Sequence, residues 1–164
     1  RIERKHGAVT EEEVRPPEAK DKRPPVTQTL KDEAFDPLSL VLGLRMRLHA
    51  ALQEGTEHFS LLMYDGRRLT RLHFTVIGPK RVQVGSTKAD TIQVDVSREL
   101  LEGYTASELA DAKGTKEPPL HMHFSHDAQF IPLLLEVKLW FGTVRATLAR
   151  TCSGGESCLL ENVR

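Results

Sequence analysis

The sequence predicts a mainly β domain, with a strongly curved antiparallel sheet or a partly open barrel and one central α-helix packed against it. Three observations lead to this fold class. One apolar segment has a helical period, several later segments alternate apolar with polar residues, and Gly, Pro and Asp-Gly sequences separate these segments. A strand with one apolar face needs a cover, so we expect the helix to cover the concave face of the sheet or to plug a barrel.

The predicted helix spans residues 36–51. Asp36 is a good N-cap residue, and Pro37 fits the first helical position because no N–H is needed there. Gly55 is suited to the end of the helix. The apolar residues that recur at helical spacing are Leu40, Val41, Leu44, Leu48 and Leu52.

The middle of the chain predicts strands with one apolar face. These strands are residues 58–63, 71–76, 82–84 and 90–96. Asp65-Gly66 predicts a two-residue hairpin turn after the first strand, and Gly78-Pro79 is expected to end the second. The strict alternation in the last of them indicates one buried and one solvated face, which is typical of antiparallel sheets.

The last third of the chain begins with a long polar connection. Residues 98–118 are expected to hold one short helical turn near residues 106–112. The most apolar strands then follow at residues 120–126, 133–139 and 144–148. Trp140 and Phe141 precede the last strand, and we expect them to pack in the core or to line a cavity between sheet and helix.

Length and composition limit the function classes. The chain has 164 residues, enough for one domain with a core, and its 23 basic and 23 acidic side chains give no net charge. This balance argues against a general nucleic-acid binder, and no apolar run approaches the ~20 residues of a transmembrane segment. We divide the chain into a strand remnant with a charged Pro-rich loop (1–35), the β-rich domain (36–151) and a C-terminal tail (152–164). The start at Arg1 is consistent with a removed leader or an internal fragment.

The two cysteines lie close together in the C-terminal tail. Cys152 and Cys158 enclose five residues, two of them glycines, which is a loop that can close as a disulfide in an oxidising compartment. The spacing does not fit a Cys-x-x-Cys redox motif or a zinc knuckle. The alternative is a pair of unpaired thiols.

Three histidines form the strongest candidate for a metal site. His121 and His123 would project from the same face of a strand, roughly 6–7 Å apart, with His126 close behind. This arrangement would suit a metal-dependent hydrolase. The alternative is that the histidines form the solvated face of an ordinary strand, and we favour that reading and expect no cofactor. The sequence contains no nucleophile elbow, phosphate-binding loop or dinucleotide-binding motif.

The order of several short motifs resembles a known family. These motifs are Asp36-Pro37-Leu38-Ser39, Tyr64-Asp65-Gly66-Arg67-Arg68-Leu69, Ser125-His126-Asp127, Pro132, and the segment Phe141 to Leu148. Together they resemble the bacterial exported family called domain of unknown function 3108, over about residues 35–150. The resemblance implies an envelope protein built mainly of antiparallel strands, and such a location favours the bridge between Cys152 and Cys158. It implies no catalytic residues.

The main functional hypothesis is a non-enzymatic periplasmic or envelope protein that binds a lipid or another apolar or amphipathic ligand in its curved sheet. The expected cavity-lining residues are Leu40, Leu44, Leu48, Phe74, Leu135, Val137, Trp140 and Phe141. Arginines of the helix and the first hairpin could add a basic rim for an anionic head group: Arg45, Arg47, Arg67, Arg68 and Arg71. The alternatives are a structural or protein-interaction module of the envelope and the histidine-based hydrolase.

Overall fold

The structure, a computed structural model, describes residues 2–5, 8–12, 34–114 and 117–148. The strands are β1 (Ile2–Lys5), β2 (Ala8–Glu12), β3 (Ala34–Phe35), β4 (His58–Tyr64), β5 (Leu69–Val84), β6 (Thr87–Glu102), β7 (Leu120–Ser125), β8 (Pro132–Leu139) and β9 (Gly142–Thr147). The helices are α1 (Ser39–Glu54) and α2 (Ala106–Gly114). Neither helix combines the length and the apolar character needed to cross a membrane.

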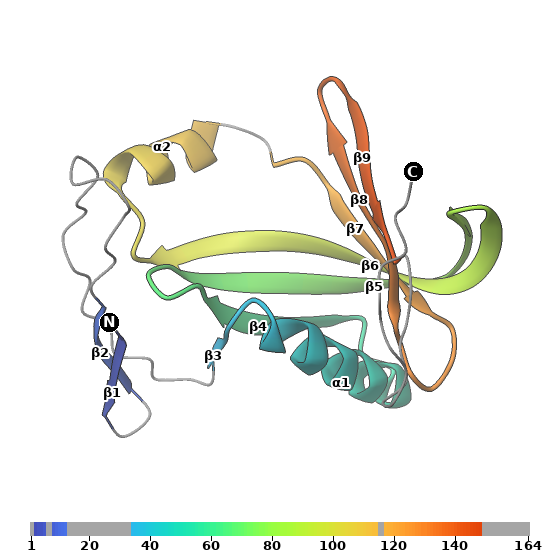
Figure 1. The fold of residues 1–164 in the computed structure, drawn as a ribbon, viewed down its shortest axis with the longest axis horizontal. Coiled ribbons are helices and arrows are strands. Elements are labelled where there is room, and N and C mark those ends of the chain that lie inside the picture. Colours follow the sequence, from blue (N-terminus) through green and yellow to red (C-terminus); the bar gives the residue numbers. More distant parts are fainter. Residues whose placement is uncertain (1, 6–7, 13–33, 115–116, 149–164) are drawn as a thin grey trace, which may run out of the picture.

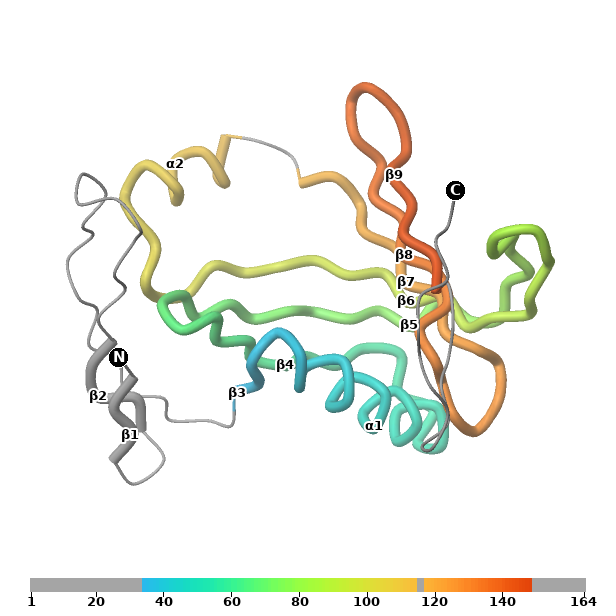
Figure 2. Tube along the Cα trace, in the orientation of Figure 1, coloured from blue at the N-terminus to red at the C-terminus, as the bar shows by residue number. Residues whose placement is uncertain are grey.

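Seven strands form one open, strongly curved sheet in the order β3-β4-β5-β6-β7-β8-β9. All neighbours are antiparallel except β3, which pairs in parallel with β4 through two residues. β5 and β6 are long and run together, whereas β7 to β9 cross them steeply (Figures 1 and 2). The sheet does not close on itself, so the open form of the predicted fold is confirmed. β1 and β2 form a separate antiparallel hairpin.

The start of α1 depends on the predicted cap, although the helix begins three residues later than expected. The Oδ1 atom of Asp36 accepts hydrogen bonds from the backbone N–H groups of Leu38 (2.8 Å) and Ser39 (3.1 Å). These bonds hold the pKa of Asp36 below its usual value, together with the Ser39 hydroxyl, whose hydrogen bond has the largest effect. At the other end, Gly55 has a φ of 68° and its position allows Thr56 N–H to donate to Ala51 O at 2.8 Å.

The hydrophobic core lies between α1 and the concave face of β4 to β7. Its buried members are Leu44, Leu48, Phe74, Ile92, Val94, Phe124 and Phe130. The strand residues occupy matching positions in the ladder, since Ile92 pairs with Phe124 and Val94 with Val76. The helix therefore covers the sheet as predicted, and side chains fill the space beneath it.

Several predicted boundaries are wrong because long strands tolerate a local irregularity. β5 does not end at Gly78-Pro79: a register shift lies between Val76 and Gly78, and the strand continues to Val84. β6 likewise extends from Thr87 to Glu102 and takes up part of the predicted polar connection, while α2 confirms the helical turn expected there.

The first hairpin turn also differs from the two-residue turn that Asp65-Gly66 predicted. Tyr64 pairs with Leu69, so four residues form the loop. The Oδ1 atom of Asp65 accepts from the N–H groups of Arg67 (3.0 Å) and Arg68 (2.7 Å), and this side-chain bonding favours the longer loop.

Candidate functional site

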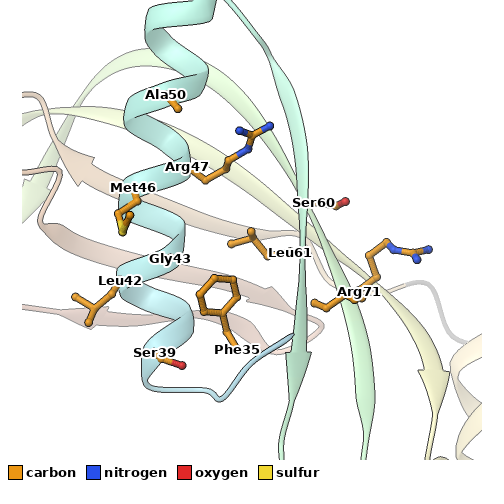
Figure 3. A pocket seen from close by; sticks show the side chains of 11 residues that line it. Phe35, Ser39, Leu42, Gly43, Met46, Arg47, Ala50, Ser60, Leu61 and Arg71 are labelled. Carbon is orange, nitrogen blue, oxygen red and sulfur yellow. The ribbon is translucent and has the colours of Figure 1, made fainter. Parts of the chain in front are cut away.

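An open groove lies between α1 and β4, beside the solid core rather than inside it. It has a volume of about 800 Å³, within the range of ligand pockets. Its lining comes from β3, α1, β4 and β5 (Figure 3). The lining residues are Phe35, Ser39, Leu42, Gly43, Met46, Arg47, Ala50, Ser60, Leu61, Leu62 and Arg71.

A second apolar stripe, which begins at Leu38 just before α1, continues along the helix and forms one wall of this groove through Leu42 and Met46. Leu38, Leu42 and Met46 follow the i, i+4, i+8 spacing, yet they are 86%, 58% and 76% exposed. The core-facing residues of the same helix, Leu44 and Leu48, are 2% and 0% exposed. The helix is therefore apolar on two sides, and the part of the chain that the structure describes covers only one of them.

The inner end of the groove depends on a close approach of Phe35 to the helix. Gly43 is buried, and a Cβ atom added there would lie 2.7 Å from the ring of Phe35. Such a contact is shorter than side chains allow, so glycine permits the ring to lie against the helix backbone. The Phe35 side chain shapes the groove in this position (Figure 3).

Two arginines give the groove its charge. Arg47 extends from α1 toward β4, while Arg71 lies across β4 from it (Figure 3). The Arg71 guanidinium donates to Glu99 Oε2 at 2.8 Å, and His73 Nε2 lies 3.4 Å from the same oxygen. For Arg47, the described residues provide neither a hydrogen bond nor an ion pair, so its cation is available to an anionic group.

The edge of β4 beside the groove is only partly covered. Among the described strands, β3 is its neighbour on this side and pairs only with Leu62 and Met63. Ser60 and Leu61 belong to the remaining part of the strand and line the groove. The site is therefore amphipathic, with an apolar wall, a strand edge and a guanidinium.

The predicted cavity-lining residues lie elsewhere. None of the eight is among the residues that line the groove. Leu44, Leu48 and Phe74 are buried core residues, whereas Leu40, Leu135 and Val137 are partly exposed. Trp140 and Phe141 are 95% and 65% exposed, so the prediction that they pack against the core or line a cavity is wrong.

The predicted basic rim is divided by the fold, and only Arg47 and Arg71 belong to the groove. Arg45 donates from Nε and Nη2 to Gln129 O at 2.9 and 2.6 Å, which ties α1 to the loop before β8. Arg68 forms an ion pair with Glu108 and lies over the ring of Tyr104. These two arginines therefore stabilise the fold.

Sequence reasoning missed Phe35, Leu42 and Met46. The stripe that starts at Leu38 could have revealed two of them, because it repeats at helical spacing on a side of α1 that the predicted core does not use. Phe35 could be found only from the tertiary contact with Gly43.

The convex face of β6 to β9 carries a second feature, a row of hydrogen-bonded polar side chains. His121 Nδ1 lies 2.6 Å from Asp95 Oδ1, and Gln93 Nε2 donates to the same oxygen at 2.7 Å. His123 Nε2 lies 3.3 Å from Glu136 Oε2, and the other carboxylate oxygen of Glu136 accepts from Arg145 Nε at 2.6 Å. His121 and His123 therefore contact two different carboxylates, those of Asp95 and Glu136.

Burial and these contacts determine the charges of this row. His123 is fully buried, and burial lowers its pKa below the usual 6.5 despite the neighbouring Glu136. Burial raises the pKa of Glu136, but the hydrogen bond and charge of Arg145, followed by those of His123, outweigh it and lower the pKa overall. A neutral imidazole thus lies beside an ionised carboxylate.

The described residues give no support to the alternative of a metal site at the three histidines. His121 and His123 contact different carboxylates, and His126 is exposed outside β7. Across residues 34–114 and 117–148, no group of three or more His, Cys, Asp or Glu side chains is arranged to hold a metal ion. The predicted bridge between Cys152 and Cys158 lies outside the described residues.

A smaller pocket of about 390 Å³, with several charged side chains in its lining, lies beside α2. Thr105 and Glu108 form a capping box, because Glu108 Oε2 accepts from Thr105 N–H at 2.8 Å and Thr105 Oγ1 accepts from Glu108 N–H at 3.2 Å. The backbone hydrogen bond from Thr105 makes the largest contribution to lowering the pKa of Glu108 to about 2. Arg98 and Glu117 form an ion pair beside it, and Arg68 pairs with Glu108, so four of the charged side chains that line this pocket are paired with one another.

The fold and groove define a class of protein: an open, curved β-sheet covered by one helix, with an amphipathic groove at the helix edge. The comparison with known families assigns the chain more closely. Residues 4–149 match the family described as "Protein of unknown function (DUF3108)", and the chain belongs to this family. The match includes the charged region before residue 35, which the sequence resemblance had left outside. Neither the curated proteins nor the solved structures contain a match.

Proposed function

We propose that this protein binds an amphipathic ligand with an anionic head group, such as a single-chain lipid, in the groove between α1 and β4. The observation that carries the proposal is the position of Arg47, a cation without a partner among the described residues, above an apolar wall. An acyl chain would cover Leu42 and Met46, and burying such side chains is favourable by about 25 cal/mol per Å².

The proposal moves the ligand from the centre of the sheet to its edge. The concave face under α1 holds Phe74, Val94 and Phe124, which are 2%, 0% and 0% exposed, and this packing leaves the ligand no place there. The groove has an open side, so a ligand could enter it without unfolding the core. The site suits binding rather than chemical conversion, since its polar groups are guanidinium and hydroxyl groups.

The head group would contact Arg47 first. A carboxylate or phosphate can accept two parallel hydrogen bonds from a guanidinium, which an alcohol cannot reproduce. Arg71 can join only if its bond to Glu99 weakens or if the head group extends around the edge of β4. In this proposal, Arg47 makes the site selective for a charged head group, and the apolar wall binds the acyl chain.

Calorimetric titration of the full chain with oleate and with oleyl alcohol tests these assignments. We expect oleate to bind more tightly, and Arg47→Gln to weaken oleate binding by about tenfold while the alcohol is unaffected. Met46→Ser should weaken both ligands. Arg81→Gln is the matched control, since Arg81 is an exposed arginine paired with Asp90 and distant from the groove residues.

Two results would overturn the proposal: absence of binding of both ligands to the unmodified protein, or equal loss of oleate affinity in Arg47→Gln and Arg81→Gln. We also propose a location in the bacterial envelope, which rests on what the sequence resemblance implies. Fractionation of the source cells, followed by detection in the periplasmic or cytoplasmic fraction, tests that part separately.

A further inference from the structure

The turn between β8 and β9 exposes two aromatic side chains at the end of a projecting hairpin. Leu139 pairs with Gly142, so Trp140 and Phe141 are the two residues between the paired positions. They are 95% and 65% exposed, and their rings contact each other at 5.2 Å between centroids. The hairpin carries this turn away from α1 and beyond the rest of the sheet (Figures 1 and 2).

The fold does not require aromatic residues at these two positions. Two-residue turns favour Gly, Asn and Asp, because those residues adopt the turn geometry at low cost. Aromatic side chains stabilise a protein chiefly when they are buried, whereas Trp140 gains almost no burial and most of Phe141 stays exposed. Most of the free energy of transferring these rings out of water therefore remains available for contact with another surface.

The charges of the hairpin indicate which kind of surface this is. Residues 132–148 carry three charged side chains, Glu136, Lys138 and Arg145. Glu136 is 15% exposed and bonded to Arg145, whereas the Arg145 side chain is 61% exposed and Lys138 is exposed. The exposed charges behind the aromatic tip are thus both positive, although the whole chain has no net charge.

We propose that the β8–β9 tip inserts into the interfacial region of a bilayer that contains anionic lipids. Trp140 and Phe141 would enter the boundary between head groups and acyl chains, where Trp is favoured, and Lys138 and Arg145 would contact lipid phosphates. A bilayer accepts a narrow, convex tip without shape complementarity. A protein partner needs about 800 Å² per side of matched surface, which two turn residues do not provide.

Trp140 is the single tryptophan of the chain, so tryptophan fluorescence reports directly on this tip. The full chain is mixed with vesicles of phosphatidylcholine containing phosphatidylglycerol, and with vesicles of phosphatidylcholine alone. We expect a blue shift and quenching by lipids brominated on the acyl chain, stronger with the anionic vesicles. Co-sedimentation gives the partition coefficient independently of fluorescence.

Substitutions at the tip should weaken partitioning without unfolding the protein. Phe141→Ser keeps the fluorescent reporter and should lower the partition coefficient about tenfold, the value expected from exposing one buried aromatic ring. Trp140→Ser, followed by co-sedimentation, should cause at least as large a loss, and Lys138→Gln a smaller one that disappears with neutral vesicles. Ile77→Ser is the matched control, since Ile77 is 56% exposed on β5 and should have no effect.

The proposal is overturned if anionic vesicles leave the emission unchanged, or if Phe141→Ser and Ile77→Ser partition alike. It is also overturned if the blue shift needs no vesicles and grows with protein concentration, which would indicate association between copies of the chain. The proposal is independent of the groove, because Arg47→Gln should not alter partitioning and Trp140→Ser should not alter oleate binding.

Discussion

The two sides of α1 both carry apolar residues, but one side is buried against the sheet and the other faces an open groove. On one side, Leu44 and Leu48 contact a sheet surface of buried side chains. On the other, Leu42 and Met46 face an open groove that ends at Phe35 and the edge of β4. The difference arises from the strands that each side meets, since the core side packs on residues of β5 to β7, whereas the groove side lies beside β4 and the short β3.

This comparison shows that an apolar helix residue can serve stability or binding, depending on which part of the sheet it meets. A buried residue contributes to the free energy of unfolding, because its removal leaves a cavity. An exposed apolar residue contributes little to stability and remains available to a ligand. Substitutions on the two sides should therefore affect different measurements.

The largest expected effect comes from truncating each side of the helix in turn. Leu48→Ala should lower the free energy of unfolding by about 2–5 kcal/mol. Leu48 is 0% exposed, so its truncation removes buried apolar contacts and leaves a cavity in the core. Met46→Ala should change the free energy of unfolding by less than about 0.5 kcal/mol, as expected at an exposed site. Urea unfolding measures both, and similar losses in the two variants would mean that the groove side is packed.

The stability of the fold should depend on pH, whereas binding of an uncharged ligand in the groove should not. The folded state keeps His123 neutral by lowering its pKa, so it binds fewer protons than the unfolded state as pH falls below about 6.5. Stability should therefore fall as pH decreases through this range, and fall again near the usual pKa of 4.5 for Glu136, whose folded-state pKa is also lowered. The groove lining contains no histidine, so binding of the uncharged oleyl alcohol should not change while the protein remains folded.

Urea unfolding at about pH 7.5 and about pH 5.5 measures the first of these effects. His123→Gln should reduce the difference in stability between the two conditions. His126→Gln, which changes an exposed histidine of the neighbouring turn, should retain it. An unchanged difference in His123→Gln would show that another group controls the pH dependence.

A small effect on stability is also expected at Gly43, on the groove side of the helix. Gly43→Ala gains up to about 1 kcal/mol of helix propensity but forces the Phe35 ring to move, so the net change should stay within about 1 kcal/mol. Oleate affinity should nevertheless fall, because Phe35 forms part of the groove. Gly114→Ala on α2 is the control, since nothing lies within 4 Å of its added Cβ, and an equal loss of affinity there would contradict this role of Phe35.

Local patterns were sufficient to predict the helix α1 and most strands of the sheet, although not β3. The Asp36 cap, the exit at Gly55 and the apolar face of β5 follow from the chemistry of nearby residues, and the structure confirms them. Boundaries failed where a long-range partner extended a strand. Pairing with β6 holds β5 together across Gly78, and a turn signal within one strand cannot reveal that pairing.

The candidate site was less predictable, because it depends on surfaces that remain uncovered. Leu44 and Met46 have the same polarity in the sequence, and only the position of the sheet decides that one is buried and the other lines a groove. Trp140 was expected inside because aromatic residues usually pack in cores, yet β8 and β9 carry it beyond the sheet.

The sequence by itself determined a mainly β chain with one capped, apolar helix and its family motifs, because caps, turns and alternation act between neighbouring residues. Tertiary structure decided which side of the helix is covered, where the sheet ends and which arginine is left without a described partner. Those outcomes depend on contacts between residues far apart in the chain, such as Arg45 with Gln129 and the core packing of α1 against β5 to β7.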